Sequence, residues 1–166
     1  MARWATVIPT WTPVAVGDTT AMTTLGFHNI QGGVAGQRLE IREIYLGGQA
    51  GASAPTFMVF GRCSTVTGAT VVSVRSAALD PATIAAATPP LCVNSTSGTF
   101  PQRSSTLGML LNLSYNAFGG IVRWYAGPDE TISILGATAS FGEASLSAFT
   151  GGTPGLMGSN IVFEWV

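Results

Sequence analysis

Short apolar runs, each closed by glycine, proline or another turn-forming residue, recur along nearly the whole chain of 166 residues. The clearest run spans 37–46, where Leu39 and Ile41 alternate with charged side chains. Alternation with a period of two is the pattern of a strand with one buried face, whereas helices repeat apolar side chains about every 3.6 residues. Many short strands with frequent turns are typical of an all-β sandwich or barrel. The pattern therefore predicts an all-β fold of eight to ten antiparallel strands.

The run at 37–46 also changes phase, because Ile44 and Leu46 continue the apolar positions out of step with those before them. Such a change predicts a bulge or bend near Arg42 and Glu43. The other expected strands lie at 18–27, 55–63, 70–74, 107–114, 120–125, 131–136, 143–149 and 160–166.

The first sixteen residues differ from the rest, because Pro9 and Pro13 interrupt them. Proline lacks a backbone donor and is confined to sheet edges. The segment 5–16 is expected to be an extended arm or an edge strand rather than a central strand. We divide the chain into an extended N-terminal arm over 1–16 and a single β-sandwich domain over 17–166. Trp4 and Trp11, together with both prolines, are the candidate residues of an assembly interface. Removing the arm should then weaken assembly more than folding.

The strand pattern stops between 76 and 105, which predicts a long loop. The segment 79–87 begins like a short helix, with Asp80 as its N-cap and Pro81 in the first helical position. A pair of prolines ends it, and the residues from 92 onward are polar and rich in turn formers. Connections of this length usually carry function or an interaction surface.

Charged residues make up only 9% of the chain, with seven arginines, no lysine and a net charge of −1. Ordinary soluble domains have about 25%. The composition argues against a disordered chain and a helical bundle, and no basic surplus exists to bind nucleic acid. Hydroxyl and amide groups could hydrate such a surface. Copies of the chain or a larger assembly could instead cover it, since interface cores are depleted of charge. We favour the second explanation.

Residues suited to catalysis or metal binding are sparse. The sole histidine, His28, follows apolar residues at an expected strand end, so we interpret it as a hydrogen-bonded structural residue. Cys63 and Cys92 lack neighbours at metal-ligand spacing. We interpret them as small buried side chains, and a disulfide between them stays open. The sequence thus predicts no enzyme, no catalytic residue, no metal site and no cofactor.

Two carbohydrate chemistries stay open. A glycosidase needs two carboxylates across a cleft, which Glu40 with Glu43 or Glu143 with Glu164 would supply, but nothing indicates the cleft. Four tryptophans could stack on sugars, although packing explains them more simply. The arginines in or beside expected strands should pair with glutamates within or between subunits: Arg38, Arg42, Arg62, Arg75 and Arg123 with Glu40, Glu43 and Glu164.

One uncharged stretch, 104–122, approaches the length of a membrane span. Its asparagines and the pair at 119–120, both glycines, suit a spanning helix poorly and a two-stranded hairpin well. We expect a chain without a membrane span or secretion signal.

The segment 119–134 joins an aromatic pair, Trp124 and Tyr125, to a Gly-Pro-Asp-Glu turn and a β-branched strand. It resembles strands of small viral jelly-roll and bacteriophage virion proteins. The segments 142–147 and 163–165 are similar to the closing strands of such domains. The low-charge composition, rich in Ala, Gly and Thr, resembles that of small head proteins of tailed phages.

This resemblance implies a single jelly-roll-like β-sandwich with a structural role in a virus particle. The implied protein is a capsid decoration (cement) or minor capsid protein, commonly a homotrimer. It would contact the major capsid protein or other virion proteins, and neither nucleic acid nor membrane. It would be made in the host cytoplasm and reside on the capsid surface.

Three alternatives remain. One is a carbohydrate- or protein-binding module, a lectin-like or C1q-like trimer that binds through the loop at 76–105. Another is a hydrolase or isomerase on a cupin-like barrel, against which the missing histidine cluster counts. The third is another phage part, such as a head-fibre or tail protein.

Overall fold

The structure is a computed structural model that describes residues 3–13, 27–31, 38–62, 71–74, 76–80, 91–95, 109–135, 143–150 and 155–166. Within these ranges the chain forms antiparallel strands joined by turns, and no helix. The predicted all-β class is therefore confirmed. Twelve strands are described, more than the eight to ten expected, because two of them fall in the stretch predicted to be a loop.

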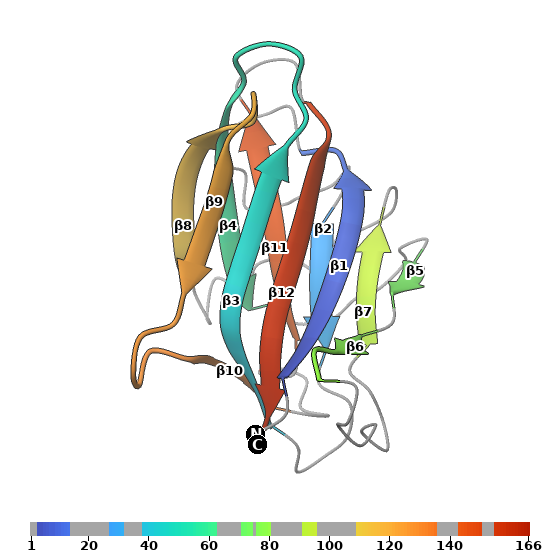
Figure 1. The fold of residues 1–166 in the computed structure, drawn as a ribbon, viewed down its shortest axis with the longest axis vertical. Helices are drawn as coiled ribbons and strands as arrows, with labels where there is room; N and C mark the ends of the chain where they lie inside the picture. Colours follow the sequence, from blue (N-terminus) through green and yellow to red (C-terminus); the bar gives the residue numbers. More distant parts are fainter. Residues whose placement is uncertain are drawn as a thin grey trace.

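The strands form two sheets of six that pack face to face (Figure 1). Sheet A runs in the order β10 (Ile132–Leu135), β3 (Arg38–Gly48), β12 (Met157–Trp165), β1 (Arg3–Trp11) and β6 (Ala77–Ala78), and β9 (Ile121–Tyr125) also pairs with β3. Sheet B runs in the order β5 (Val71–Val74), β7 (Leu91–Ser95), β2 (Phe27–Gln31), β11 (Glu143–Thr150), β4 (Pro55–Arg62) and β8 (Met109–Asn116).

The strand pairing is nested along the chain. In sheet A, β1 pairs with β12, and β3 pairs with β9 and β10 in succession. In sheet B, β2 pairs with β11, and β4 pairs with β8. Each successive pair lies inside the previous one in sequence and alternates between the sheets. The two ends of the chain therefore lie side by side, as Figure 1 shows.

The core lies between the sheets and is built from the apolar positions of the alternating strands. Among the side chains that the structure describes, sheet A supplies most of the large ones, and sheet B supplies Ile30, Met58 and Phe60. A further link between the layers comes from Arg62 of β4, whose Nη1 donates a 2.7 Å hydrogen bond to the backbone oxygen of Ser133 in β10.

The predicted bulge is present in β3. Val162 pairs with Glu43 and Phe163 pairs with Ile41, so Arg42 has no residue opposite it in β12. The extra residue shifts the phase of the strand. As a consequence, Glu40 and Glu43 both lie on the outer face of sheet A. In a regular strand, residues three positions apart would lie on opposite faces.

The predicted extended arm over 1–16 is wrong for residues 3–11, which form β1 and pair with β12. The tryptophans of β1 pack in the core, Trp4 being 6% exposed and Trp11 2%. Burial of Trp4, Ile8 and Trp11 in the core outweighs the effect of proline. Pro9 is tolerated because it lies where the register with β12 shifts, between Ile8 and Trp11. Residues 3–11 therefore belong to the sandwich and do not form an arm outside it.

The predicted long loop over 76–105 is wrong where β6 and β7 form. β6 pairs with β1, and β7 lies between β2 and β5. Residues 81–90, which hold most of the expected helix, lie outside the described residues, as do Cys63, the side chain of Cys92 and residues 18–26 of the first expected strand. The uncharged stretch at 104–122 contributes β8 and the start of β9. Among the described residues, no helix is long and apolar enough to cross a bilayer.

Candidate assembly surface

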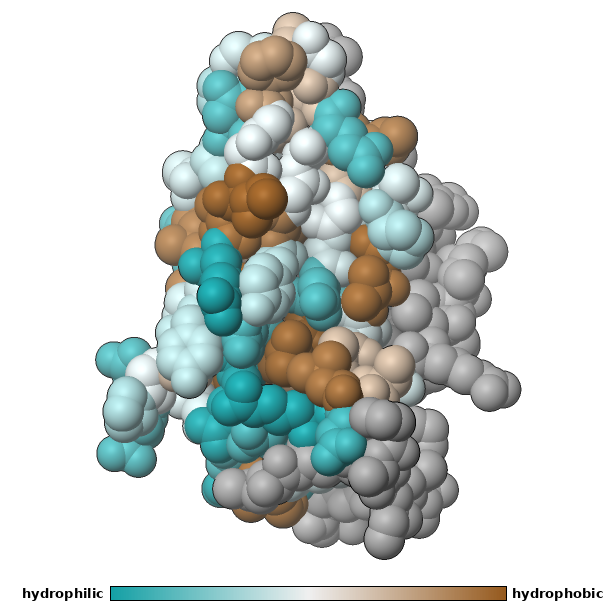
Figure 2. Space-filling model, viewed as in Figure 1, coloured by the Kyte–Doolittle hydropathy of each residue, from teal (hydrophilic) through white to brown (hydrophobic). Residues whose placement is uncertain are grey.

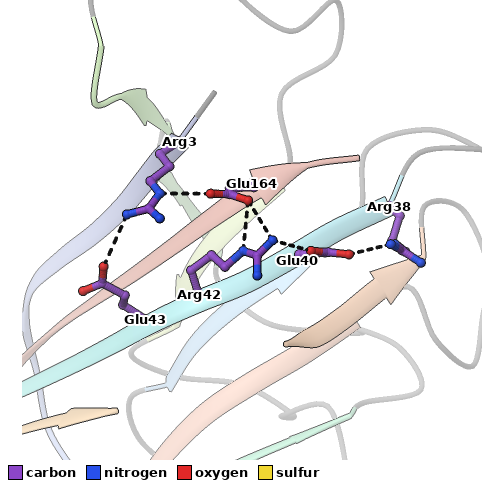
Figure 3. A network of polar contacts seen from close by, with 6 residues as sticks. All are labelled: Arg3, Arg38, Glu40, Arg42, Glu43 and Glu164. Atoms are coloured by element: carbon purple, nitrogen blue, oxygen red, sulfur yellow. Dashed lines mark hydrogen bonds and ion pairs between the residues drawn. The ribbon is translucent and has the colours of Figure 1, made fainter. Parts of the chain in front are cut away.

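Seven of the fifteen charged side chains gather on the outer face of sheet A, on four neighbouring strands. Figure 3 shows six of them, joined in a continuous series of ion pairs. The full set, called the charged network below, consists of Arg3, Arg38, Glu40, Arg42, Glu43, Arg123 and Glu164.

Arg42, the bulged residue of β3, lies at the centre of the network. Its guanidinium donates to Glu164 at 2.9 Å and to Glu40 at 2.7 Å. Arg3 reaches Glu164 from the other side, with its Nε 2.9 Å from Oε1, and Arg38 donates to Glu40. The bulge therefore brings one guanidinium between two carboxylates of adjacent strands.

Glu43 extends the network toward β9. Arg123 donates to its Oε2 at 2.8 Å, the Tyr45 hydroxyl donates to the same oxygen, and Arg3 lies 3.9 Å from Oε1. Arg123 also stacks on the Tyr45 ring, 5.1 Å from its centroid, and lies 5.9 Å from the ring of Tyr125. The sequence predicted glutamate partners for Arg38, Arg42 and Arg123, but not those of Arg3 or the role of Tyr45. Arg62 bonds to the Ser133 backbone oxygen described above, and Arg75 lies outside the described residues.

Burial and hydrogen bonding act in opposite directions on the network's carboxylates. Burial favours the protonated form and would raise the pKa of Glu43, but hydrogen bonds from Tyr45 and Arg123 outweigh it, so the pKa lies below its ordinary value. The pKa of Glu164 is lowered in the same way, against burial, by Arg3 and Arg42. Both carboxylates are therefore ionised at neutral pH.

The carboxylates of the network lie deeper than most of its guanidinium groups. The carboxylate side chain of Glu164 is 8% exposed, whereas that of its partner Arg3 is 45% exposed, and Arg38 and Arg123 are similarly open. Four arginines cover three glutamates, so the outer surface of the network is positive. Guanidinium groups are weakly hydrated and planar, which makes them common anchors at protein interfaces.

Large apolar side chains stand exposed on the same face. Val7, Tyr125 and Leu135 are about half exposed, and Ile121 is 79% exposed. Each is paired by register with a residue on the outer face of β3 or β12, or at the glycine end of β3. Figure 2 shows such brown side chains among teal ones on this face. The sequence had no signal for them, because outward and inward positions of these strands are both apolar.

A shallow groove of about 580 Å³ crosses the glycine-rich end of this face. Its walls include Val7, Tyr45 and Ile121, and glycines of β3, β12 and the β8–β9 turn leave it open. Asn160 also lines it, and the side-chain oxygen of this residue is buried without a hydrogen-bond partner.

His28 lies inside the core, where a short polar chain crosses between the sheets. Trp11 Nε1 donates to Ser159 Oγ at 3.1 Å, and Ser159 Oγ lies 2.9 Å from His28 Nδ1. Burial lowers the pKa of His28 to about 3, so the imidazole is neutral. Because His28 has no exposed surface, no substrate reaches this serine–histidine contact. The interpretation of His28 as a hydrogen-bonded structural residue is confirmed.

The structure does not bring the predicted interface residues together at the surface. Trp4, Trp11 and Pro13 are buried within the chain itself, because the inward side of β1 packs on sheet B. Pro9 alone is exposed, and it lines the groove. In the described part of the chain, no three metal-binding side chains converge.

These features define an all-β sandwich with an apolar and arginine-rich outer face. Comparison with protein-family models, with curated proteins and with solved structures finds no match to the chain.

Proposed function

We propose that this chain is a non-enzymatic structural component of a virus particle, a bacteriophage capsid decoration (cement) or minor capsid protein. The nested strand pairing supports the proposal. The first strand pairs with the last, and further pairs in both sheets are enclosed by it in sequence, which supports a jelly-roll arrangement of the sandwich. Viral capsid proteins, lectins and cupins use this architecture, so the surface must decide between these roles.

The observation that carries the proposal is the outer face of sheet A, where half-exposed apolar side chains stand among the charged network. An isolated domain would expose such a face to water. Contiguous apolar surface rimmed by polar groups marks interaction sites, and arginine and tyrosine are enriched in interfaces. A protein on a capsid lattice buries this face against neighbouring subunits.

The core supports a structural rather than a catalytic role. The one serine–histidine contact among the described residues is sealed within the core, and its histidine is neutral. A cupin enzyme would instead present several histidines to a metal, and the chain has only one histidine.

Co-sedimentation with particle shells that lack the chain tests the proposal. We expect saturable binding at a fixed ratio to the major capsid protein. Ile121→Asp places a charge on the face and should abolish binding, whereas Leu110→Asp, at an exposed residue of β8 in sheet B, should not. A wild-type chain that never sediments with shells would contradict the proposal.

The alternative is a carbohydrate- or protein-binding module, lectin-like or C1q-like, and the groove on sheet A favours it. Tyr45 offers an aromatic ring in the wall of the groove, on which a sugar ring could stack. Glycan-array binding that Tyr45→Ala removes would support this alternative and count against the capsid role.

A further inference from the structure

The turn between β9 and β10 projects away from the body of the sandwich, as Figure 1 shows. It is closed by a 3.2 Å hydrogen bond from the Glu130 N–H to the Gly127 carbonyl. Asp129 holds a positive φ of 63°, a conformation that glycine adopts more readily. The side chains of Asp129 and Glu130 are exposed, and neither pairs with an arginine among the described residues.

The charged network presents the opposite charge with unused donors. A guanidinium has five N–H donors. Within the described part of the chain, the Arg38 guanidinium contacts Glu40 alone, and its side chain is 46% exposed. Leu135 pairs with Arg38 by register and is itself exposed, so an apolar side chain adjoins the free donors. This corner therefore combines free N–H donors with an exposed apolar side chain.

We propose that the β9–β10 turn of one copy docks on the Arg38 corner of a second copy of this chain. The Asp129 and Glu130 carboxylates accept hydrogen bonds from the Arg38 guanidinium, and Pro128 covers Leu135. The inference rests on the proposed structural role and names its first partner. Turn and corner are different surfaces, so the contact is heterologous and closes into a ring when its rotation allows.

Charge complementarity selects a second copy as the partner. The chain has few charges, and the turn concentrates two of its eight acidic residues at one projecting point. Seven charges occupy the network, which carries one positive charge in excess. Every copy of the chain carries one acidic turn and one Arg38 corner, so each copy can both donate and accept this contact.

Sedimentation equilibrium of the full chain tests the contact. The double variant Asp129→Asn/Glu130→Gln removes the acidic charge, and asparagine tolerates the positive φ, so the fold is preserved. We expect its self-association constant to fall at least about tenfold, and that of Arg38→Gln similarly. Asp80→Asn, which removes an exposed acid beyond β6, should leave association unchanged. Raising salt from about 0.02 to about 0.5 M should weaken wild-type association, because exposed charges are screened.

Mixing the turn variant with Arg38→Gln provides a second test. Each variant retains the half of the contact that the other has lost. The mixture should form a one-to-one dimer that grows no further, while each variant alone stays monomeric. A wild-type monomer at low salt, or variants that associate as wild type does, would overturn the inference. Shell binding by such a monomer would leave the proposed function intact, so the two failures are distinguishable.

Discussion

Individual side chains of this protein are buried in two different electrostatic settings. On sheet A, Glu43 and Glu164 are kept ionised by donors that lie above them. In the core, His28 is kept neutral, because no anion is in contact with it among the described residues and burial disfavours its charge. The sequence predicted that His28 would be hydrogen-bonded, because a lone histidine after apolar residues has few other roles. Its partner Ser159, 131 positions away, could not be predicted without the sheet order.

Acid should destabilise the protein in two stages. The pKa of His28 falls from its ordinary 6.5 to about 3 on folding, so below pH 6.5 only the unfolded chain binds this proton. The free energy of unfolding should therefore fall with decreasing pH by up to about 1.4 kcal/mol per unit. The pKa values of Glu43 and Glu164 are also lowered, from 4.5, and their stabilising contribution is present above that pH and is lost only below it.

Urea unfolding at several pH values between about 4.5 and about 7.5 measures the first stage. His28→Asn should be less stable at neutral pH but have a nearly flat pH dependence above pH 4.5. An equally steep decline in the variant would show that another group causes it.

Glycines decide how the β8–β9 turn fits against the end of β3. A Cβ at Gly48 would lie 2.2 Å from the Ala117 backbone oxygen, and one at Gly120 would lie 2.1 Å from the Asn116 backbone oxygen. The backbone amides of the same end bond to this turn, with Gly48 N–H donating to Gly120 and Ala50 N–H to Ala117. Gly48 and Gly120 also line the groove, where they present no side chain.

Gly48→Ala should lower the free energy of unfolding by about 1–3 kcal/mol, because the turn must move or strain to admit the methyl group. Gly47→Ala is the matched control, because a Cβ added at this position would have no other atom within 4 Å. Thermal and urea unfolding of both variants measures the difference. Equal stability of the two would contradict the described packing.

β1 is the strand whose place in the fold could not be predicted from the sequence. The phase change of β3 was visible because charged and apolar side chains alternate there, and its bulge was predicted correctly. In β1 both faces carry apolar or small residues, so the prolines dominated the interpretation. The pairing of β1 with β12 joins opposite ends of the chain, and no local pattern contains it. The outer face of sheet A was missed for the same reason.

Removing residues 1–11 should abolish folding rather than weaken assembly alone, because β1 supplies Trp4, Ile8 and Trp11 to the core. Trp4→Ala, a milder change, should cost about 3–5 kcal/mol of stability. Circular dichroism and urea unfolding distinguish the outcomes. A truncated chain that unfolds cooperatively at the wild-type urea concentration would restore the arm interpretation.

At the scale of the whole molecule, the distribution of charge matters more than its amount. About half of the fifteen charges lie in one network on one face, and exposed apolar side chains lie beside them. Hydroxyl and amide groups could hydrate much of the remaining surface. The outer face of sheet A instead has the composition of an interface, with arginine and tyrosine next to apolar residues.

The mass of the purified chain in solution tests this account most directly. Light scattering over an about tenfold range of concentration should give a closed oligomer, a trimer of the 17.1 kDa chain, whose mass stays constant over the upper part of the range. A mass of one chain throughout, at low salt, would contradict the claim that copies of the protein associate through the outer face of sheet A, where the β9–β10 turn docks on the Arg38 corner.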